Sequence, residues 1–308
     1  MKKDDKLMDL FKLGGCVYYS QNREDLVLLS FFPELDDGFY IDVGAFDPDL
    51  DSVTKLFYLK GWSGVNVEPQ PDRYRMFEKR RKRDKNLNIG IAEKSSTLTL
   101  RSYKSQGLST FSGKLKQKYE YEPDIDTTDY SEYQVPVRPL AEVLNELDVP
   151  HINFMKVDVE GLEYEVLKSN DWKKFRPEVL CIESNHVEKD WRPLLREADY
   201  EFVFDDGLNE YYADKASGRK EKFDYVKEVV HYRGGGIRAD HFELMIELGR
   251  RLSDKTHHVE VLAAEQMKNA AKLREYEILK QQSNSIKETA ERLLRLIKRN
   301  AAAMFGRK

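Results

Sequence analysis

The sequence predicts an α/β fold with a mostly parallel sheet, a closing antiparallel hairpin and a long helical extension. Helix-like segments alternate with short apolar runs, as in parallel sheets whose crossovers are helices. Two apolar stretches flank Asp205-Asp206-Gly207, and this pattern predicts the hairpin. The apolar runs, bounded by turn residues, predict buried strands at residues 39–43, 65–67, 152–157 and 179–182.

The first strand ends in a loop that suits a ligand. Its apolar run stops at Gly44, which lets the backbone turn sharply and approach a ligand with no Cβ in the way. Ligands of open α/β sheets bind in the crevice outside the carboxyl ends of the strands. We therefore expect residues 38–46 to form a strand and its ligand loop. A plain strand and turn is the alternative for so short a motif.

The second strand ends in an acid that favours a nucleoside. Glu68 follows the Gly44 turn by about 20 residues, the spacing at which a carboxylate accepts hydrogen bonds from ribose hydroxyls. The second glycine that would admit a pyrophosphate is missing, and Asp47 stands near its place. We expect Asp47 to repel a diphosphate. S-adenosylmethionine carries a cationic sulfonium and no phosphate, so the pattern favours a methyl donor over NAD.

Acids end four of the predicted strands: Asp42, Glu68, Asp158 and Glu183. The carboxyl ends of parallel strands lie at one edge of a sheet, where ligands bind. Four acids in register at that edge are difficult to explain as surface charge. We therefore expect a binding site there.

The predicted helices follow from local patterns. Residues 20–32 predict a helix with Ser20 as its N-cap. Residues 55–59 predict a second helix that Gly61 closes. Residues 73–85 predict a basic helix with a solvated face.

Three further segments lie between Glu68 and Asp158. Residues 87–92 predict a third strand, with residues 96–100 as its hairpin partner. Residues 119–133 are acidic and aromatic. That composition fits a solvated surface loop, or a lid that stacks tyrosines on a sugar.

Several motifs match one family in order and spacing. They are Ser20-Gln21 with Glu24-Asp25, Asp42 to Ala45, Ser52 to Thr54, Gly61 to Gly64 leading into Val67 to Pro69, Lys156 to Gly161, Arg176-Pro177, and Asp206 to Asn209. Together they resemble the FkbM family of S-adenosylmethionine-dependent methyltransferases, over roughly residues 18–215. The resemblance implies a class I methyltransferase (Rossmann-like) fold. It also implies O-methylation, often of a sugar or polyketide hydroxyl.

The resemblance also implies a donor site. Glu68 would hold the ribose. Gln21 would close over the methionine end, or belong only to the chemistry of the N-terminal helix. Ser52 and Thr54 would support the donor loop, or merely cap a helix. The residues lining the methionine portion would be Asp42, Gly44 and Ala45.

The catalytic candidates are Asp158, Glu160, Glu183 and His186, which follow the fourth and fifth strands. Methyl transfer to a sugar hydroxyl gains from a positioned general base. His186 is the base candidate, and a surface loop histidine is the alternative. Clustered carboxylates also suit Mg²⁺, which could bind a sugar diol. No ligand spacing here is diagnostic, so we assign no metal site from the sequence.

Composition narrows the class of protein. The 308 residues carry a net charge of -4, which gives no indication of nucleic-acid binding. The two cysteines, Cys16 and Cys181, form no disulfide framework, so we expect a cytoplasmic protein. No apolar run is long enough to span a bilayer, and the N-terminus lacks the apolar stretch of a secretory signal.

The C-terminal extension has the composition of a long helix. It lacks Gly and Pro from Arg250 to Phe305, and Met245, Leu252 and Val259 recur at seven residues. We expect a broken coiled coil or helical hairpin that makes a homo-oligomer. Its basic amphipathic end, 291–308, is either a solvated helix end or a contact with the anionic inner face of the membrane. We favour the membrane contact.

We therefore expect an N-terminal lead at 1–16, an FkbM-like methyltransferase domain at 17–233 and a helical extension at 234–308. The expected activity is methyl transfer to a hydroxyl of a glycan or glycolipid precursor, in cell-surface polysaccharide biosynthesis. One alternative is a methyltransferase for another small molecule, such as a polyketide. The other is a non-catalytic interaction protein with a degenerate donor fold on a coiled-coil scaffold.

Overall fold

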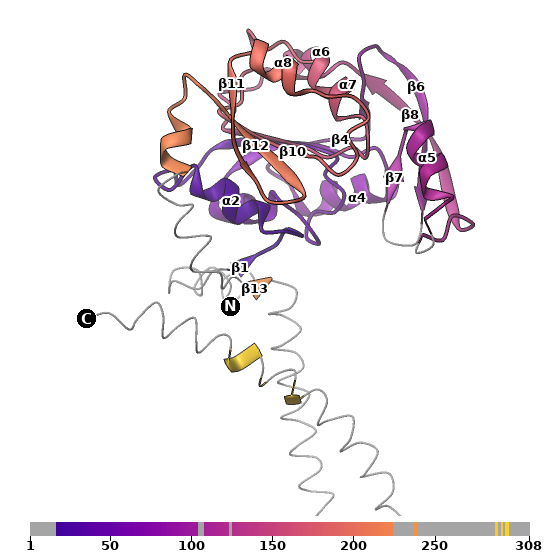
Figure 1. Cartoon of the computed structure of the whole chain (residues 1–308), viewed down its shortest axis with the longest axis horizontal. Coiled ribbons are helices and arrows are strands. Elements are labelled where there is room, and N and C mark those ends of the chain that lie inside the picture. The colour runs from indigo at the N-terminus through magenta and orange to yellow at the C-terminus, as the bar shows by residue number, and fades with distance from the viewer. Residues whose placement is uncertain are drawn as a thin grey trace, which may run out of the picture. The chain divides into compact units, whose positions relative to one another are not determined.

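The computed structural model (Figure 1) describes residues 17–103, 108–122, 125–223 and 237–238, with positions 287, 288, 291 and 293–295. The chain divides into two compact units, and each is described by itself. One unit is Tyr19–Glu228. The other combines Met1–Tyr18 with Val229–Lys308.

The unit that contains both termini has few described residues. Strands β1 (Val17–Tyr18) and β13 (Ile237–Arg238) pair in parallel, and the described positions from 287 to 295 are helical. The lead 1–16 and the predicted seam at Met245, Leu252 and Val259 lie outside the described residues. The coiled coil, the oligomer and the membrane contact stay predictions. No helix in the described part of the chain is long and apolar enough to cross a membrane.

The other unit is built on a seven-stranded sheet in the order β11-β12-β10-β9-β2-β3-β4. Strands β2, β3, β4, β9 and β10 are parallel, whereas β12 runs antiparallel to both of its neighbours. This arrangement confirms the mostly parallel sheet and its closing hairpin. The strands are β2 (Phe39–Val43), β3 (Ser63–Val67), β4 (Lys85–Leu87), β9 (Phe154–Val157), β10 (Val179–Glu183), β11 (Tyr200–Asp205) and β12 (Asn209–Asp214).

Helices cover both faces of this sheet because its strands are apolar on both sides. In β10, Leu180 and Ile182 pack in one core, and Val179 and Cys181 pack in the other. Figure 1 shows α6, α7 and α8 on one side of the sheet, with α2 and α4 on the other. The helices are α2 (Glu24–Ser30), α3 (Lys55–Lys60), α4 (Pro71–Arg80), α6 (Leu140–Glu146), α7 (Glu163–Lys168) and α8 (Arg192–Glu197).

A second, four-stranded sheet is inserted between β4 and α6, in the order β5-β8-β6-β7. Its strands are β5 (Gly90–Ile91), β6 (Ser96–Tyr103), β7 (Ser109–Thr110) and β8 (Tyr130–Arg138), and α5 (Gly113–Tyr119) lies between β7 and β8. The predicted hairpin of residues 87–92 with 96–100 is wrong, because both β5 and β6 pair with β8 instead. The predicted solvated loop at 119–133 is wrong at both ends, since Tyr119 is the buried last residue of α5 and β8 begins at Tyr130.

The N-terminal helix begins later than expected. Arg23, with a left-handed φ of 66°, occupies the N-cap position and makes no side-chain cap bond. Ser20 is therefore not the cap. It accepts the backbone N–H of Asp25 from outside the helix at 3.3 Å, and its hydroxyl donates to the Asp25 carboxylate at 2.8 Å.

The basic segment 73–85 hides one cation that fixes the loop after β2. Arg81 is fully buried, and its guanidinium donates to the carbonyl of Pro48 at 2.6 and 3.0 Å and to that of Thr54 at 3.2 Å. It also donates to the Ser52 hydroxyl at 2.8 Å. The expectation of a solvated face is thus wrong at Arg81. The planar, five-donor guanidinium suits a loop whose carbonyls would otherwise be unpaired.

We predict that Arg81→Ala destabilises the protein by on the order of 3 kcal/mol, because buried carbonyls lose a charged donor. The matched control is Arg80→Ala, since Arg80 is exposed and pairs with Asp49. That change should cost at most about 1 kcal/mol. Urea unfolding measures the stability of both variants. Equal midpoints would contradict the argument that Arg81 stabilises the loop after β2.

Candidate active site

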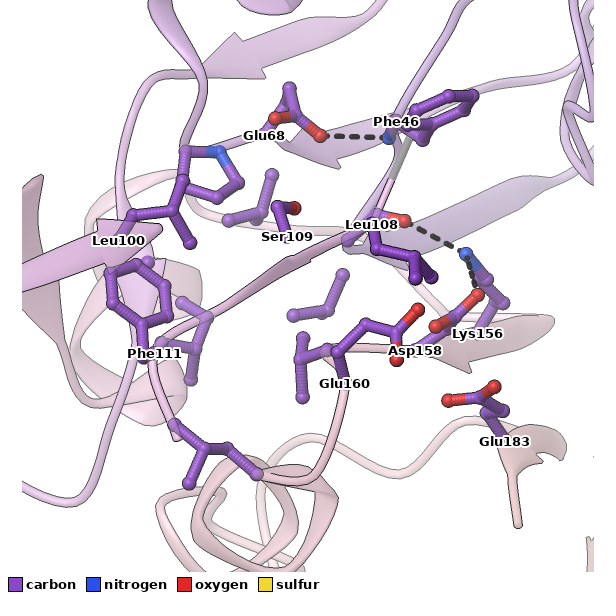
Figure 2. A pocket seen from close by; sticks show the side chains of 18 of the residues that line it. Phe46, Glu68, Leu100, Leu108, Ser109, Phe111, Lys156, Asp158, Glu160 and Glu183 are labelled. Carbon is purple, nitrogen blue, oxygen red and sulfur yellow. Dashed lines mark hydrogen bonds and ion pairs between the residues drawn. The ribbon is translucent and has the colours of Figure 1, made fainter. Parts of the chain in front are cut away.

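A cavity of about 310 Å³ opens where the parallel strands β2, β3, β9 and β10 end (Figure 2). The loops after these strands form one side. Glu68, Asp158 and Glu183 line it, as expected for acids at strand ends, whereas Asp42 lies within β2 and does not line it. The inserted sheet supplies an apolar wall, with Leu100 on β6 and with Leu108 and Phe111 on either side of β7. The sequence did not indicate this wall, because it depends on long-range strand pairing.

Glu68 lies on this cavity, 3% exposed, directly after β3. Its carboxylate accepts the backbone N–H of Phe46 at 2.8 Å and that of Gln70 at 2.7 Å. Burial raises the pKa of Glu68 to about 7, although these two hydrogen bonds favour the charged form. Each carboxylate oxygen has a second lone pair, so Glu68 can still accept a hydroxyl of a ligand.

Lys156 connects the loops after β2 and β9. Its ammonium donates to the carbonyl of Gly44 at 2.8 Å and pairs with Asp158 at 3.1 Å and Asp42 at 3.6 Å. These carboxylates hold the pKa of Lys156 above its usual range although the side chain is buried, so it stays a cation. Lys156 lines the cavity but is not among the site residues predicted from the sequence. A lysine inside an otherwise apolar strand was the signal that could have found it.

Four of the predicted donor residues lie behind the cavity rather than on it. Thr54 donates to Asp42 at 3.2 Å, and Ser52 accepts from Arg81. Ala45 is buried, and its N–H donates to the carbonyl of Val67. None of these side chains is among the residues that line the described cavity. Their geometry supports the loop, which was one of the alternatives for Ser52 and Thr54.

Gly44 does line the cavity, and the fold itself requires a glycine there. A Cβ at Gly44 would lie 1.8 Å from the carbonyl oxygen of Asp158, and its φ of +83° disfavours other residues. Any substitution of Gly44 would therefore disturb the contact between two loops. Such a variant cannot serve as a test of ligand binding.

Asp47 does not have the role expected from the sequence. It is buried, accepts the N–H groups of Asp49 and Leu50, and pairs with Arg73 at 2.7 Å. Asp47 is not among the cavity-lining residues, so it is not the group that would repel a diphosphate. The negative charge that a ligand meets comes from other carboxylates.

Gln21 lines the cavity from the turn before α2. Two acids shape that turn. Glu24 accepts the N–H of Asn22 at 2.7 Å, and Asp25 accepts the N–H of Tyr19 at 2.7 Å. Burial raises the pKa of both carboxyls, to about 7 for Asp25. These acids organise the chain, whereas Gln21 can contact a ligand.

Asp158, Glu160 and Glu183 gather on the cavity, with one oxygen from each within 4.8 Å of the others (Figure 2). Tyr119 donates its hydroxyl to Glu160 at 2.9 Å. Burial first, and then the charge of Asp158, raises the pKa of Glu160 to about 7 and that of Glu183 to about 10. We refer to Asp158, Glu160 and Glu183 as the acid cluster.

His186 lies on the same cavity beside the acid cluster. Its Nε2 is 3.7 Å from a carboxylate oxygen of Glu160, and its buried Nδ1 has no hydrogen-bond partner among the described residues. Burial, with the charge of Lys118, lowers the pKa of His186. The imidazole is therefore neutral at neutral pH and able to accept a proton.

The mixed sheet and the cavity at its carboxyl edge fit a class I methyltransferase. The Methyltransferase FkbM domain matches residues 42–202, more than half of the chain. The chain thus belongs to the FkbM methyltransferase family, and the resemblance noted in the sequence is confirmed. No curated protein and no solved structure matches it.

We predict that Glu183→Gln stabilises the protein at pH 8 in the presence of a chelator, by about 1 kcal/mol or more. The pKa of Glu183 is raised from 4.5 to about 10. The wild-type protein is most stable, with respect to this group, below pH 4.5, where Glu183 is protonated in both the folded and the unfolded state. That stability is lost as the pH rises toward 10, because the unfolded state loses the proton first. The variant has no carboxyl to ionise, so its advantage should grow between pH 5 and pH 9.

Thermal unfolding across that range measures the effect. Glu146→Gln is the control. The exposed ion pair with Arg138 holds the pKa of Glu146 low, so this carboxyl does not titrate between pH 5 and pH 9. A difference between Glu183→Gln and the wild type that stays constant with pH would contradict the burial argument.

Proposed function

We propose that the chain transfers a methyl group from S-adenosylmethionine to a hydroxyl of a glycan or glycolipid precursor, in cell-surface polysaccharide biosynthesis. The observation that carries the proposal is one cavity that joins Glu68, suited to a ribose, to the acid cluster and His186. Membership of a methyltransferase family supplies the reaction class.

The residues of the cavity fit this donor. Glu68 would accept the ribose hydroxyls, and Gln21 and the Gly44 loop lie at the same edge of the sheet. Against one lysine, Lys156, the lining carries the carboxylates of Glu68, the acid cluster and Asp51. Even with Glu183 protonated, as its raised pKa implies, the acids of the lining outnumber its lysine, so the cavity attracts a sulfonium and disfavours a diphosphate. When bound, the donor supplies an activated methyl group.

On the acceptor side, the chain must orient a hydroxyl and remove its proton. His186 is neutral and open to the cavity, whereas Lys156 is held as a cation and cannot act as a base. We assign His186 as the general base. The acceptor oxygen forms its bond to the methyl carbon as the sulfur–methyl bond breaks, and the hydroxyl proton passes to the imidazole. Alignment of the two substrates is the main task.

The acceptor class is the least constrained part of the proposal. The cavity has carboxylates that can accept hydrogen bonds from hydroxyl groups, and they lie beside an apolar wall. This combination suits a polyol joined to an apolar group. A polyketide hydroxyl is the second candidate, since the same wall would contact it. The comparison to make is mass spectrometry of cell-envelope glycans with and without the protein. The proposal predicts that, in cells without the protein, a glycan is lighter by the mass of one CH2 for each methyl group that is no longer added. Unchanged glycan masses would reject it.

The C-terminal extension belongs to the same proposal. We expect it to form a homo-oligomer and to hold the cytoplasmic enzyme at the anionic inner face of the membrane. Each basic residue near such a surface contributes about 1 kcal/mol, and salt screens the attraction. Light scattering tests self-association. Co-sedimentation with anionic vesicles at low and high salt tests the membrane contact.

We predict that Glu68→Gln weakens binding of S-adenosylmethionine at least about ten-fold. Its amide NH2 cannot accept a ribose hydroxyl, and it would face the backbone N–H of Phe46 or of Gln70 that the carboxylate accepts. Calorimetry measures the affinity, and circular dichroism checks the fold. Asp72→Asn, on the exposed start of α4, is the control. Wild-type affinity in Glu68→Gln would remove Glu68 from the donor site, and no binding by the wild type would favour the non-catalytic alternative.

We predict that His186→Gln lowers turnover about 100-fold or more and leaves donor affinity within about two-fold. The measurement is transfer of a labelled methyl group to envelope glycans from cells that lack the protein. His151→Gln is the control, because His151 is largely exposed and pairs with Glu178 outside the cavity. Full turnover in His186→Gln would assign the proton transfer to another group.

A further inference from the structure

We propose that the acid cluster of Asp158, Glu160 and Glu183 binds one hard divalent cation of the Mg²⁺ and Mn²⁺ class. The cation would receive two oxygens of the acceptor, so the acceptor class becomes a vicinal diol. The metal site is inferred from the spacing and the burial of the three carboxylates. Only its role toward the acceptor rests on the proposed function.

The spacing of the three carboxylates suits a single ion. Three ligand oxygens lie within 4.8 Å of one another, and they come from β10 and from the loop after β9. Two oxygens on opposite sides of a cation are separated by twice the metal–oxygen distance, roughly 4.0–4.2 Å for Mg²⁺ and roughly 4.6–5.2 Å for Ca²⁺, so an ion of the Mg²⁺ class would draw the three oxygens slightly closer together. Small rotamer changes would therefore complete the site without backbone movement.

An unpaired carboxylate oxygen is the second, independent observation. Glu183 is only 8% exposed, and its buried Oε2 has no hydrogen-bond partner in the described part of the chain. Figure 2 shows its carboxylate directed toward Asp158 and Glu160. A buried carboxylate without a donor is costly, and a cation bound by the cluster would remove that cost.

The charge near the cluster is not balanced by the protein. Three carboxylates face one lysine, and Lys156 contacts only Asp158 among them. That lysine is also committed to Asp42 and to the carbonyl of Gly44. Tyr119 gives Glu160 a neutral hydroxyl. A divalent cation supplies the missing positive charge, and the alternative is a proton shared among the carboxyls.

The site would remain open on the side of the cavity. The side chains of Asp158 and Glu160 are 35% and 20% exposed, so a bound cation could accept further oxygen ligands from a diol. A hydroxyl on the cation becomes more acidic. The hydroxyl proton would pass to the neighbouring His186, and the oxygen would bond to the methyl carbon as the sulfur–methyl bond of the donor breaks.

The test uses the purified full-length protein after chelator treatment, with Mn²⁺ alone as the probe. Electron paramagnetic resonance of free Mn²⁺ should give one site per chain, and added Mg²⁺ should displace the ion. Glu183→Gln and Asp158→Asn should each weaken Mn²⁺ binding at least about ten-fold. Glu68→Gln, a change in the same cavity outside the cluster, should bind Mn²⁺ like the wild type.

Absence of stoichiometric Mn²⁺ binding, or wild-type affinity in Glu183→Gln, would overturn the metal site and leave the shared proton. Equal weakening in Glu68→Gln would overturn it as well, because the effect would then belong to the whole cavity. A donor titration on the same samples separates the two proposals. Donor binding without Mn²⁺ binding rejects only the metal, whereas Mn²⁺ binding without donor binding rejects only the proposed donor function.

Discussion

The site depends on one buried cation, the ammonium of Lys156. It ties the loop after β2 to the loop after β9 through Gly44 and Asp158, and it compensates the fully buried Asp42. Gly44 must then be a glycine, because the two loops meet closely enough for its Cβ to strike a carbonyl. This contact fixes the start of the loop that carries Asp158 and Glu160, whereas Glu183 is placed by the pairing of β10 with β9.

Much of the sheet could be predicted from local patterns. Apolar runs that end in acids indicated β2, β3, β9 and β10, and parallel pairing brings those ends together. Glu68 and the acid cluster were found because an acid at a strand end is visible in the sequence. The family motifs gave the same edge of the sheet, and the FkbM match agrees with them.

The rest depended on contacts between distant segments. Arg81 looked like any cation of a basic helix, and only the folded loop at 48–54 makes it structural. Asp47 looked like a charge for a ligand, but Arg73 neutralises it from α4. The inserted sheet was missed because β8 pairs with strands on both sides, and a one-dimensional pattern does not report which strands pair.

The two ends of the inserted segment lie next to each other. Gly90 is paired with Val137, Ile91 with Arg138, and the N–H of Ala92 donates to the carbonyl of Arg138 at 3.0 Å. An insert whose two ends are neighbours can be exchanged as a cassette, with the parallel strands left intact. Under the proposed function, replacing this one segment would change the apolar wall of the cavity and leave Gly44 and Glu68 in place. For an engineer, the junctions at Gly90 and Arg138 are the natural grafting points.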